Sequence, residues 1–237
     1  MDKNSKANDA IVIQARLGSK RFPKKILFKV NKKETVLEYL IERLKFSKEF
    51  KKLIVITTKK KIDNKIVKIC KKKNISIFRG SENDVLDRYY KCAKKFKIKN
   101  IVRITSDCPL VDPKMIDQMY KKFLKQKFDY ISNTTPSNKS TYPNGMDIEI
   151  FNFKSLLKAF KEVNDVFLRE HVTHYFWMNP SKFKQGSFRG KKNLSNVRIT
   201  LDYHSDLKII KKIIKNFKNY RNFSLKEIIC FLNSNKK

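Results

Sequence analysis

A strongly basic stretch follows the first apolar run of the chain. Residues 11–13 are Ile-Val-Ile, and the sequence continues as QARLGSKRFPKK over residues 14–25. Its cations are Arg16, Lys20, Arg21, Lys24 and Lys25. Because crowded like charges repel each other, either water screens them or an anion lies among them. Gly18 and Ser19 favour the anion, since a turn of small residues offers backbone N–H donors and lets the chain approach a phosphate closely.

Polar residues also follow the other predicted strands. They are Thr57 and Thr58, residues 79–81, residues 105–108, and Asp202. The carboxyl ends of parallel strands share one edge of a sheet, so we expect these side chains to meet there. Asp107 alone is typical of a turn before Pro109, but its pairing with Asp202 favours a metal role, because Mg²⁺ takes one or two protein carboxylates and fills its shell with phosphate and water. The pattern predicts a site for a metal-bound polyphosphate.

Short apolar runs alternate with amphipathic helical patterns in the first half of the chain. Strands are expected at residues 11–13, 53–56, 75–78 and 101–104, and helices around residues 36–44, 62–70, 86–96 and 116–123. The first helix opens with a Thr35–Glu38 capping box, and the last begins behind Asp112 and Pro113. This alternation predicts an α/β fold with a doubly wound, mainly parallel sheet and helices on both faces.

The alternation breaks after residue 130. We expect a polar loop at residues 133–144, then a strand at 146–151, helices at 153–163 and 167–178, a late strand at 196–201 and two closing amphipathic helices. Residues 1–9 are predicted to be a disordered tail, and residues 10–237 a single domain with an elaboration at about residues 133–190.

The net charge of +34 raises the possibility of nucleic-acid binding. Ten of the 56 basic residues are Arg, which leaves 46 Lys spread along the chain. Proteins that recognise bases and phosphates favour Arg, whose guanidinium group can donate two parallel hydrogen bonds. Because most of the basic residues here are Lys, the charge indicates solvated faces with loose attraction to polyanions. A nucleic-acid-binding protein stays open as an alternative.

No apolar run approaches the roughly 20 residues of a membrane span, and the N-terminus has no signal-peptide core.

Cysteine usage gives no sign of a disulfide framework or a metal site. Cys70, Cys92, Cys108 and Cys230 are far apart and form no CxxC motif. Four free thiols are typical of a reducing compartment, so we expect a cytoplasmic protein. Cys108 follows Asp107, but no histidine is evident as its base, and we do not predict a nucleophile there.

Six motifs occur in order along the chain: IQARLGSKRFPKKIL, FRGSENDVLDRYY, RITSDCPLVDP, YPNGMDIEIF, REHVT and RITLDYHSDL. Together they resemble the cytidylyltransferase family of spore-coat polysaccharide biosynthesis proteins, which is related to the acylneuraminate and 3-deoxy-manno-octulosonate cytidylyltransferases. The resemblance extends from about residue 11 to residue 217. It implies a fold like that of the nucleotide-diphospho-sugar transferases. It also implies a cytoplasmic, Mg²⁺-dependent homodimer that couples CTP to a sugar acid, releasing pyrophosphate, for surface polysaccharide biosynthesis.

The same resemblance implies roles for individual residues. The nucleotide-binding residues would be Gln14, Ala15, Arg16, Gly18, Ser19, Arg21, Lys25, Arg79 and Ser81. The catalytic residues would be Arg16, Lys25 and Asp107, and the metal ligands Asp107 and Asp202. The acceptor side would hold Tyr142, Gly145, Asp147, Glu149, Arg169, Glu170 and His171. Asp87 and Arg88 are as typical of a surface ion pair as of a ligand role.

The sequence leaves the acceptor open among sialic, legionaminic, pseudaminic and octulosonic acids. It also leaves open another nucleotidyltransferase or a glycosyltransferase of the same fold that uses a different nucleotide. No specific nucleic acid and no membrane insertion are expected for the enzyme.

Overall fold

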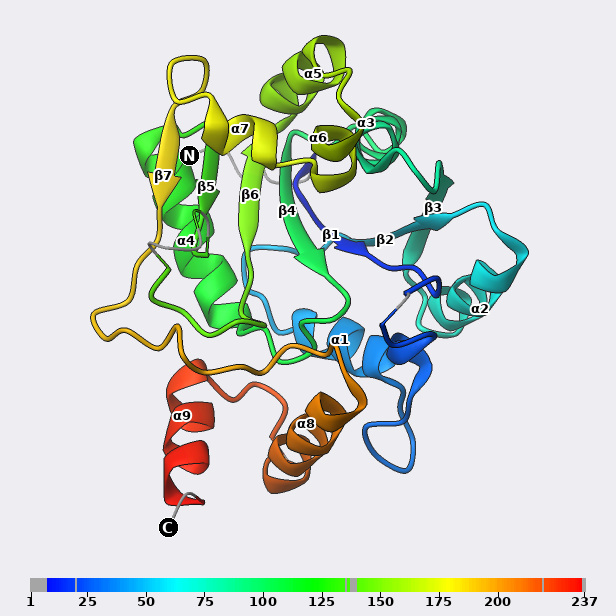
Figure 1. Cartoon of the computed structure of the whole chain (residues 1–237), viewed down its shortest axis with the longest axis vertical. Coiled ribbons are helices and arrows are strands. Elements are labelled where there is room, and N and C mark those ends of the chain that lie inside the picture. The colour runs from blue at the N-terminus through cyan, green and yellow to red at the C-terminus, as the bar shows by residue number, and fades with distance from the viewer. Residues whose placement is uncertain (1–7, 20, 135, 137–139, 219, 236–237) are drawn as a thin grey trace.

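One seven-stranded sheet forms the centre of the computed structural model, which describes all residues except 1–7, 20, 135, 137–139, 219 and 236–237 (Figure 1). The strands are β1 (Ala10–Gln14), β2 (Leu53–Thr58), β3 (Ser76–Gly80), β4 (Asn100–Thr105), β5 (Tyr130–Ser132), β6 (Glu149–Asn152) and β7 (Gln185–Ser187). Their order is β3-β2-β1-β4-β6-β5-β7. Within this sheet β6 pairs antiparallel with β4 and β5, and the other pairings are parallel.

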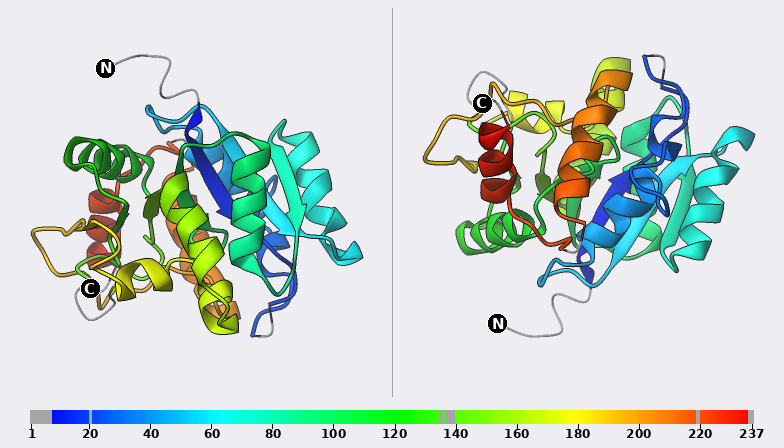
Figure 2. Two further views of the ribbon diagram at one scale, coloured as in Figure 1. Left: turned by 90° about the horizontal axis from the view of Figure 1, so that it is seen from above. Right: turned by 90° about the horizontal axis from the view of Figure 1, so that it is seen from below.

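Helices cover both faces of the sheet (Figure 2). One apolar core includes side chains from α1 (Val36–Leu44), α2 (Asn64–Lys72), α4 (Pro113–Gln126), α8 (His204–Asn216) and α9 (Leu225–Ser234). The opposite core includes side chains from α3 (Val85–Lys95), α5 (Phe153–Glu162) and α7 (His174–Met178). The predicted doubly wound, mainly parallel α/β fold is therefore confirmed.

Local capping fixes where the helices begin. The predicted capping box at α1 forms, because Glu38 N–H donates to Thr35 Oγ1 while the Glu38 carboxylate accepts from the Thr35 backbone N–H. Asp112 caps α4, and Pro113 occupies its first turn.

The strand order places a topological switch between β1 and β4. From β1 the chain moves outward through β2 and β3, and it then returns to the other side of β1 as β4. Connections leave in opposite directions there, and in open α/β sheets ligands bind outside the carboxyl ends of the strands at such a point. The loop after Gln14 and the turn after Thr105 follow the two strands that flank this switch point.

Two expectations for individual segments are wrong, and two short strands lie where no strand was predicted. Residues 196–201 form no sheet strand: they make an isolated bridge between Arg198 and Asn144, because the segment crosses the edge of the sheet. The helix expected at 167–178 is divided into α6 (Val166–His171) and α7, since Val172 takes φ 52°. The short strands β5 and β7 were not expected.

Two residues of the predicted tail, Asn8 and Asp9, make defined contacts with the sheet domain. Lys99 N–H donates to Asn8 O at 2.8 Å, and Asn100 N–H donates to Asp9 Oδ1 at 2.9 Å. The Tyr120 hydroxyl donates to the other oxygen of the same, buried Asp9 carboxylate. Asn8 and Asp9 therefore belong to the fold, and residues 1–7 of the predicted tail lie outside the described residues.

A buried arginine joins the C-terminal segment to the sheet domain. Arg43 of α1 is 0% exposed and donates to the backbone oxygens of Val111, Arg221 and Phe223. Its guanidinium also lies 3.9 Å from the centre of the Phe223 ring. Burial lowers the pKa of Arg43 to about 10, so the side chain is still a cation at neutral pH.

Replacing Arg43 by Met is expected to lower the free energy of unfolding by about 3 kcal/mol, because two buried carbonyl oxygens and one partly buried one lose their donor. Thermal unfolding should show a fall in Tm of roughly 10 °C. Lys45→Met, at the exposed end of the same helix, should change stability by less than about 0.5 kcal/mol. Equal effects of the two changes would contradict this role.

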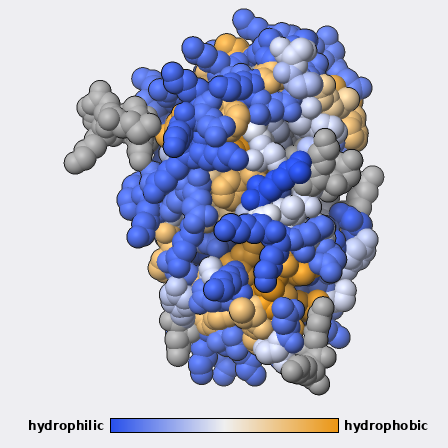
Figure 3. Space-filling model, turned by 90° about the vertical axis from the view of Figure 1, so that its left-hand side faces the viewer, coloured by the Kyte–Doolittle hydropathy of each residue, from blue (hydrophilic) through white to orange (hydrophobic). Residues whose placement is uncertain are grey.

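The excess charge is carried on the surface. On the face shown in Figure 3, hydrophilic residues cover most of the molecule and surround an apolar patch. Across the part of the chain that the structure describes, none of the helices is long and apolar enough to cross a membrane.

Candidate functional site

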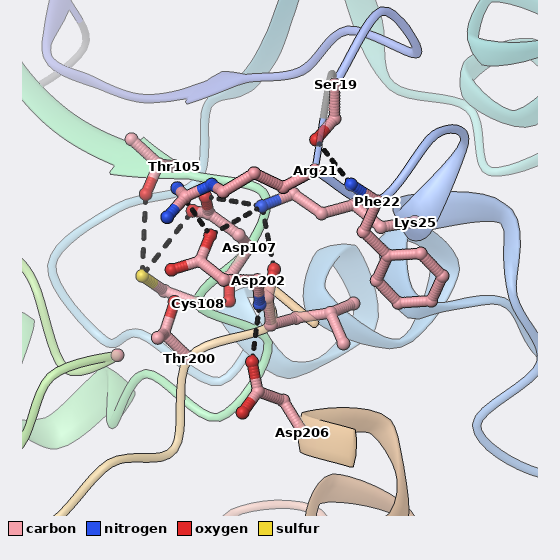
Figure 4. Close-up of polar contacts among 12 residues, drawn as sticks. Ser19, Arg21, Phe22, Lys25, Thr105, Asp107, Cys108, Thr200, Asp202 and Asp206 are labelled. Atoms are coloured by element: carbon pink, nitrogen blue, oxygen red, sulfur yellow. Dashed lines mark hydrogen bonds and ion pairs between the residues drawn. The ribbon is translucent and has the colours of Figure 1, made fainter. Parts of the chain in front are cut away.

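Lys25 links two carboxylates at the edge of the sheet (Figure 4). It opens the short helix η2 (Lys25–Leu27), and its Nζ donates to Asp107 Oδ2 at 2.9 Å and to Asp202 Oδ1 at 3.1 Å. The same ammonium donates to Leu201 O at 2.7 Å. Its side chain is only 11% exposed, so a cation is held between two anions in a site that is largely shielded from water.

The basic loop after β1 is folded so that it directs Lys25 inward. Leu17 N–H donates to Asp63 Oδ1 at 2.9 Å, and Phe22 N–H donates to Ser19 Oγ at 3.3 Å. Phe22 is buried, which anchors the middle of the loop. Ser19 thus shapes the turn that carries the cations.

Two arginines also contact Asp202. Arg21 Nη2 lies 3.2 Å from Asp202 Oδ1, and Arg198 Nη2 lies 3.0 Å from Oδ2. Burial acts to raise the pKa of Asp202, but hydrogen bonds from Arg198 and Lys25 outweigh it and lower that pKa below its ordinary value. The carboxylate is therefore ionised at neutral pH, as a metal ligand must be.

Backbone contacts fix the distance between the two carboxylates. Leu201 N–H donates to Asp107 O at 2.8 Å, and the Thr200 hydroxyl donates to the same oxygen at 3.3 Å. Asp206, in the first turn of α8, accepts from Asp202 N–H at 2.7 Å. The segment that failed to form a sheet strand is thus tied to the turn after β4.

Gly145, predicted on the acceptor side, packs directly against the backbone of residues 199–200. It has φ +105°, and a Cβ atom there would lie 2.5 Å from Thr200 N. Its own N–H donates to Asp147 Oδ2 at 2.8 Å. The close approach of the two backbones requires glycine at this position.

Gly145→Ala is expected to lower kcat/KM by about 10²-fold, because a displaced residue 200 would move Asp202. The free energy of unfolding should fall by about 2 kcal/mol from the strained φ and the clash. Gly190→Ala is the matched control, since its Cβ would meet nothing closer than 3.5 Å. Steady-state kinetics and thermal unfolding of both variants check the prediction, and a normal Gly145→Ala enzyme would contradict it.

Asp147 and Cys108 extend the polar cluster beyond Asp107. Cys108 Sγ lies 3.6 Å from Asp147 Oδ2 and 3.7 Å from Asp107 Oδ1. Burial, with the two carboxylates, raises the pKa of the Cys108 thiol well above its ordinary value. A protonated thiol that donates to carboxylates agrees with the expectation that Cys108 is no nucleophile.

Glu149 is held in a buried ion pair. Arg103 of β4 contacts it directly, and the Tyr130 hydroxyl donates to Glu149 Oε1 at 2.6 Å. The carboxylate of Glu149 outweighs burial and raises the pKa of Arg103. Arg103 Nε is buried without a hydrogen-bond partner in the described structure. The predicted acceptor residue Glu149 therefore has a fixed orientation.

Helix α6 connects the predicted acceptor and nucleotide sides. Arg16 Nη2 lies 3.7 Å from Glu170 Oε1, and Arg169 Nε donates to Asp84 Oδ2 at 2.7 Å. The His171 ring lies 4.3 Å from the ring of Phe167. Arg16 and Glu170, assigned to different substrates, thus meet across the two sides.

Four further predicted nucleotide residues are held in local structure. Gln14 ends β1 with its Oε1 buried and unpartnered, and Ala15 N–H donates to Ile56 O at 3.0 Å. Ser81 Oγ accepts from Asp84 N–H at 3.1 Å. Gly18 lies beside Glu82, because a Cβ on it would be 3.8 Å from Glu82 Oε1.

Arg79 is engaged with the loop after β2. Its guanidinium donates to Thr58 O at 3.0 Å, to Asn64 Oδ1 at 2.8 Å and to Lys60 O at 2.9 Å. These bonds hold that loop, and no described contact joins Arg79 to the Lys25 cluster. Nucleotide binding stays a prediction for this residue.

The structure brings together part of the predicted site. Described contacts link Arg21, Lys25, Asp107 and Asp202 into one cluster. No described contact joins Tyr142 to this cluster; its ring lies 6.0 Å from that of Phe188. Residues 135 and 137–139 of the predicted acceptor loop lie outside the described residues.

Three arginines hold the site, and sequence reasoning gave no role to two of them, Arg198 and Arg103. Arg198 and Arg103 orient Asp202 and Glu149. Arg88 is 0% exposed and donates to Ser81 O at 2.7 Å, so of the two alternatives left open for Asp87 and Arg88 the surface ion pair is excluded. Asp87 instead pairs with Lys91. Only Arg88 had a sequence signal: it lies on α3 between the buried Leu86 and Tyr89.

Fold and site define an α/β nucleotidyltransferase-type protein, with cations and two carboxylates at the switch point of the sheet. A family model described as cytidylyltransferase matches residues 10–234. The chain belongs to the cytidylyltransferase family and is a CTP-dependent nucleotidyltransferase.

Individual relatives agree with this family. The chain is 30% identical to the spore coat polysaccharide biosynthesis protein SpsF of Bacillus subtilis, over 96% of this chain and 95% of that protein. A cytidylyltransferase structure from Leptospira borgpetersenii has a TM-score of 0.91 at 37% identity, covering 97% of this chain and 95% of the other. The structure of a CMP:2-keto-3-deoxy-manno-octonic acid synthetase complexed with CTP has a TM-score of 0.65 at 12% identity, over 88% and 99% of the two chains, a likeness in fold.

Proposed function

We propose that this cytidylyltransferase couples CTP to a sugar acid, giving a CMP-sugar and pyrophosphate for surface polysaccharide biosynthesis, with Mg²⁺ as its metal. The observation that carries the proposal is the ammonium of Lys25 held between Asp107 and Asp202 at the switch point. The similarity to a spore-coat polysaccharide protein and to a synthetase that binds CTP supports the substrate class.

The cations of the β1 loop are suited to a triphosphate. Arg21 and Lys25 converge on Asp202, and Arg16 is 41% exposed at the neighbouring edge. In the proposed reaction the acceptor hydroxyl forms a bond to the α-phosphorus of CTP while the bond to the leaving pyrophosphate breaks. These side chains would neutralise charge on the departing oxygens, where fixed cations lower the barrier most.

The donor set at the cluster fits Mg²⁺. Asp107 and Asp202 each place one oxygen within 3.1 Å of the same Nζ, so both face one cation position. Oxygen ligands are those Mg²⁺ prefers, and two suffice when phosphates and water complete the shell. Bound there, the metal would neutralise phosphate charge and make the acceptor hydroxyl more acidic.

The chain's own groups would then orient the acceptor. Asp147 is partly buried, and desolvation raises its pKa above the ordinary value. Glu149 is fixed by Arg103 and Tyr130. Both come from the segment after the polar loop: Asp147 precedes β6, and Glu149 is the first residue of that strand. These positions would hold sugar hydroxyls in one orientation, which accounts for a large part of catalysis.

A pyrophosphate-release assay with Mg²⁺ tests the proposal. CTP, UTP and GTP are each offered with a panel of sialic, legionaminic, pseudaminic and octulosonic acids. Release that needs both CTP and one sugar acid is expected. Release with a sugar 1-phosphate and UTP or GTP would instead support another transferase of this fold and overturn the assignment of the substrates.

We also propose a cytoplasmic homodimer. All four cysteines are free, which is typical of a reducing compartment. Exposed apolar side chains on α6 and α7, among them Val166 at 73% and Phe167 at 54%, would be covered by a second copy. Light scattering should give twice the chain mass of 28.2 kDa; a monomer at assay concentrations would overturn this proposal alone.

A further inference from the structure

A second basic pocket lies away from the Lys25 cluster. It has a volume of about 1080 Å³. Its walls are the loop of residues 29–34, the end of α2, and α8 with the residues that follow it to Arg221. The loop and α8 lie side by side at the lower right of Figure 1 and again in the right-hand view of Figure 2.

This pocket is more basic than the composition of the chain explains. Nine of its sixteen lining residues are Lys or Arg, against 56 of 237 in the whole chain. The other large cavity, about 840 Å³ beneath α4, has five lysines among sixteen lining residues. The share of basic residues in that cavity is near the share in the whole chain, so the enrichment in Lys and Arg is specific to the pocket beside α8.

The carboxylates that line the pocket are already neutralised. Glu34 accepts from Arg221 through both oxygens at 2.9 Å, and Glu38 accepts from Lys72 at 3.0 Å. Burial acts to raise the pKa of Glu38, but hydrogen bonds from Thr35 and Lys72 outweigh it and lower the pKa to about 2.

Six lysines in the pocket therefore keep their charge uncompensated. Within the described part of the chain these six lysines form no ion pair. They are Lys29, Lys32, Lys33, Lys211, Lys215 and Lys218. Three of them, at positions 211, 215 and 218, recur at intervals of four and three along α8 and its continuation, which places them on one side. They face the lysines of the loop across the pocket.

The pocket is preformed. Val30 N–H donates to Glu34 O at 2.9 Å, which closes the loop on itself. The ring of Phe28, at the start of the loop, lies 5.8 Å from the ring of His204, at the start of α8. Phe22 lies 5.5 Å from the same histidine. Because both walls are already joined, an anion could bind without a costly rearrangement.

We propose that this pocket is a second anion-binding site, which takes a compact oligophosphate. Its cations come from three separate segments and converge on one concave space, whereas a nucleic-acid strand is followed by a continuous basic groove with stacking aromatics. Eight of its nine basic residues are Lys, which neutralise dense charge as point cations and lack the planar fork that reads shape.

Inorganic tripolyphosphate is the probe, titrated calorimetrically at about 0.15 M ionic strength to suppress diffuse attraction. An Arg21→Ala/Lys25→Ala background weakens anion binding at the first cluster. Removing three pocket charges with Lys32→Gln/Lys211→Gln/Lys215→Gln should weaken binding at the remaining site about tenfold, which corresponds to about 1.4 kcal/mol. These lysines are exposed, so the fold should be unchanged.

A matched triple, Lys94→Gln/Lys99→Gln/Lys154→Gln, removes the same charge from the cavity beneath α4 and should change the affinity less than about twofold. Equal loss in both triples, or no site in the double-alanine background, would overturn the proposal. Tighter binding of a single-stranded RNA or an acidic polysaccharide than of tripolyphosphate, lost in the pocket triple, would overturn the compact ligand in favour of a polymer. None of these readouts depends on CTP turnover, so the proposed function stands or falls separately.

Discussion

Asp107→Ala is expected to lower kcat/KM with CTP by about 10³-fold or more, while thermal unfolding shows a folded protein. The loss follows because the side chain supplies one of two carboxylates that face a common cation position, and charge stabilisation at such a centre carries much of the barrier. The fold should persist because Asp107 holds the segment of residues 200–201 through its backbone oxygen, which the substitution leaves in place.

Two companion variants make this test specific. Asp107→Asn keeps the size of the side chain and removes its charge, so it should be nearly as inactive as the alanine variant. Glu162→Gln likewise replaces a carboxylate by an amide, at the exposed end of α5, where Glu162 pairs with Lys182. This variant should keep activity within about twofold. Near-normal turnover by either Asp107 variant would refute the metal role of this residue.

The central cluster was predictable from sequence because strand ends are predictable. Asp107 follows a short apolar run, and parallel strands bring such ends to one edge. Lys25 and Arg21 follow the first strand in the same way. The contacts between these side chains agree with that reasoning. Position along a strand is a local property, so a single sequence carries it.

The supports of the cluster were less predictable because they depend on distant partners. Arg103 and Glu149 are 46 residues apart, and the residues around each of them show no pattern that predicts an ion pair between the two. The segment near Asp202 has the apolar alternation of a strand, yet its backbone donates to Asp107 O instead of a neighbouring strand. Positive φ at a β-branched residue such as Val172 has no sequence signal either.

The basic character of the chain has two physical meanings. Most lysines are solvated on helix faces, as their spacing predicts. Around Glu34 and α8, however, folding gathers cations from three segments that are far apart in sequence. No count of lysines distinguishes these cases, because local density on the surface depends on which faces meet.

Lys25→Met is expected to separate metal binding from turnover. Turnover should fall by about 10²- to 10³-fold, because a cation that faces the phosphates is lost. In the absence of nucleotide, Mn²⁺ should bind about tenfold more tightly. Lys25 Nζ lies 2.9 Å from Asp107 and 3.1 Å from Asp202, so an ammonium occupies the position that attracts a divalent ion. Removing it leaves two carboxylates with less competition for the metal.

Electron paramagnetic resonance of free Mn²⁺, with and without the protein, measures this affinity directly. Thermal unfolding gives a second readout: Mn²⁺ should raise the Tm of the variant more than that of the original protein, because tighter binding to the folded state stabilises it more. Lys24→Met removes a neighbouring exposed charge and should leave Mn²⁺ affinity within about twofold. If Asp107 and Asp202 share a metal, removing the competing ammonium of Lys25 must tighten Mn²⁺ binding. Weaker Mn²⁺ binding by Lys25→Met than by the original protein would therefore mean that the two carboxylates do not share a metal.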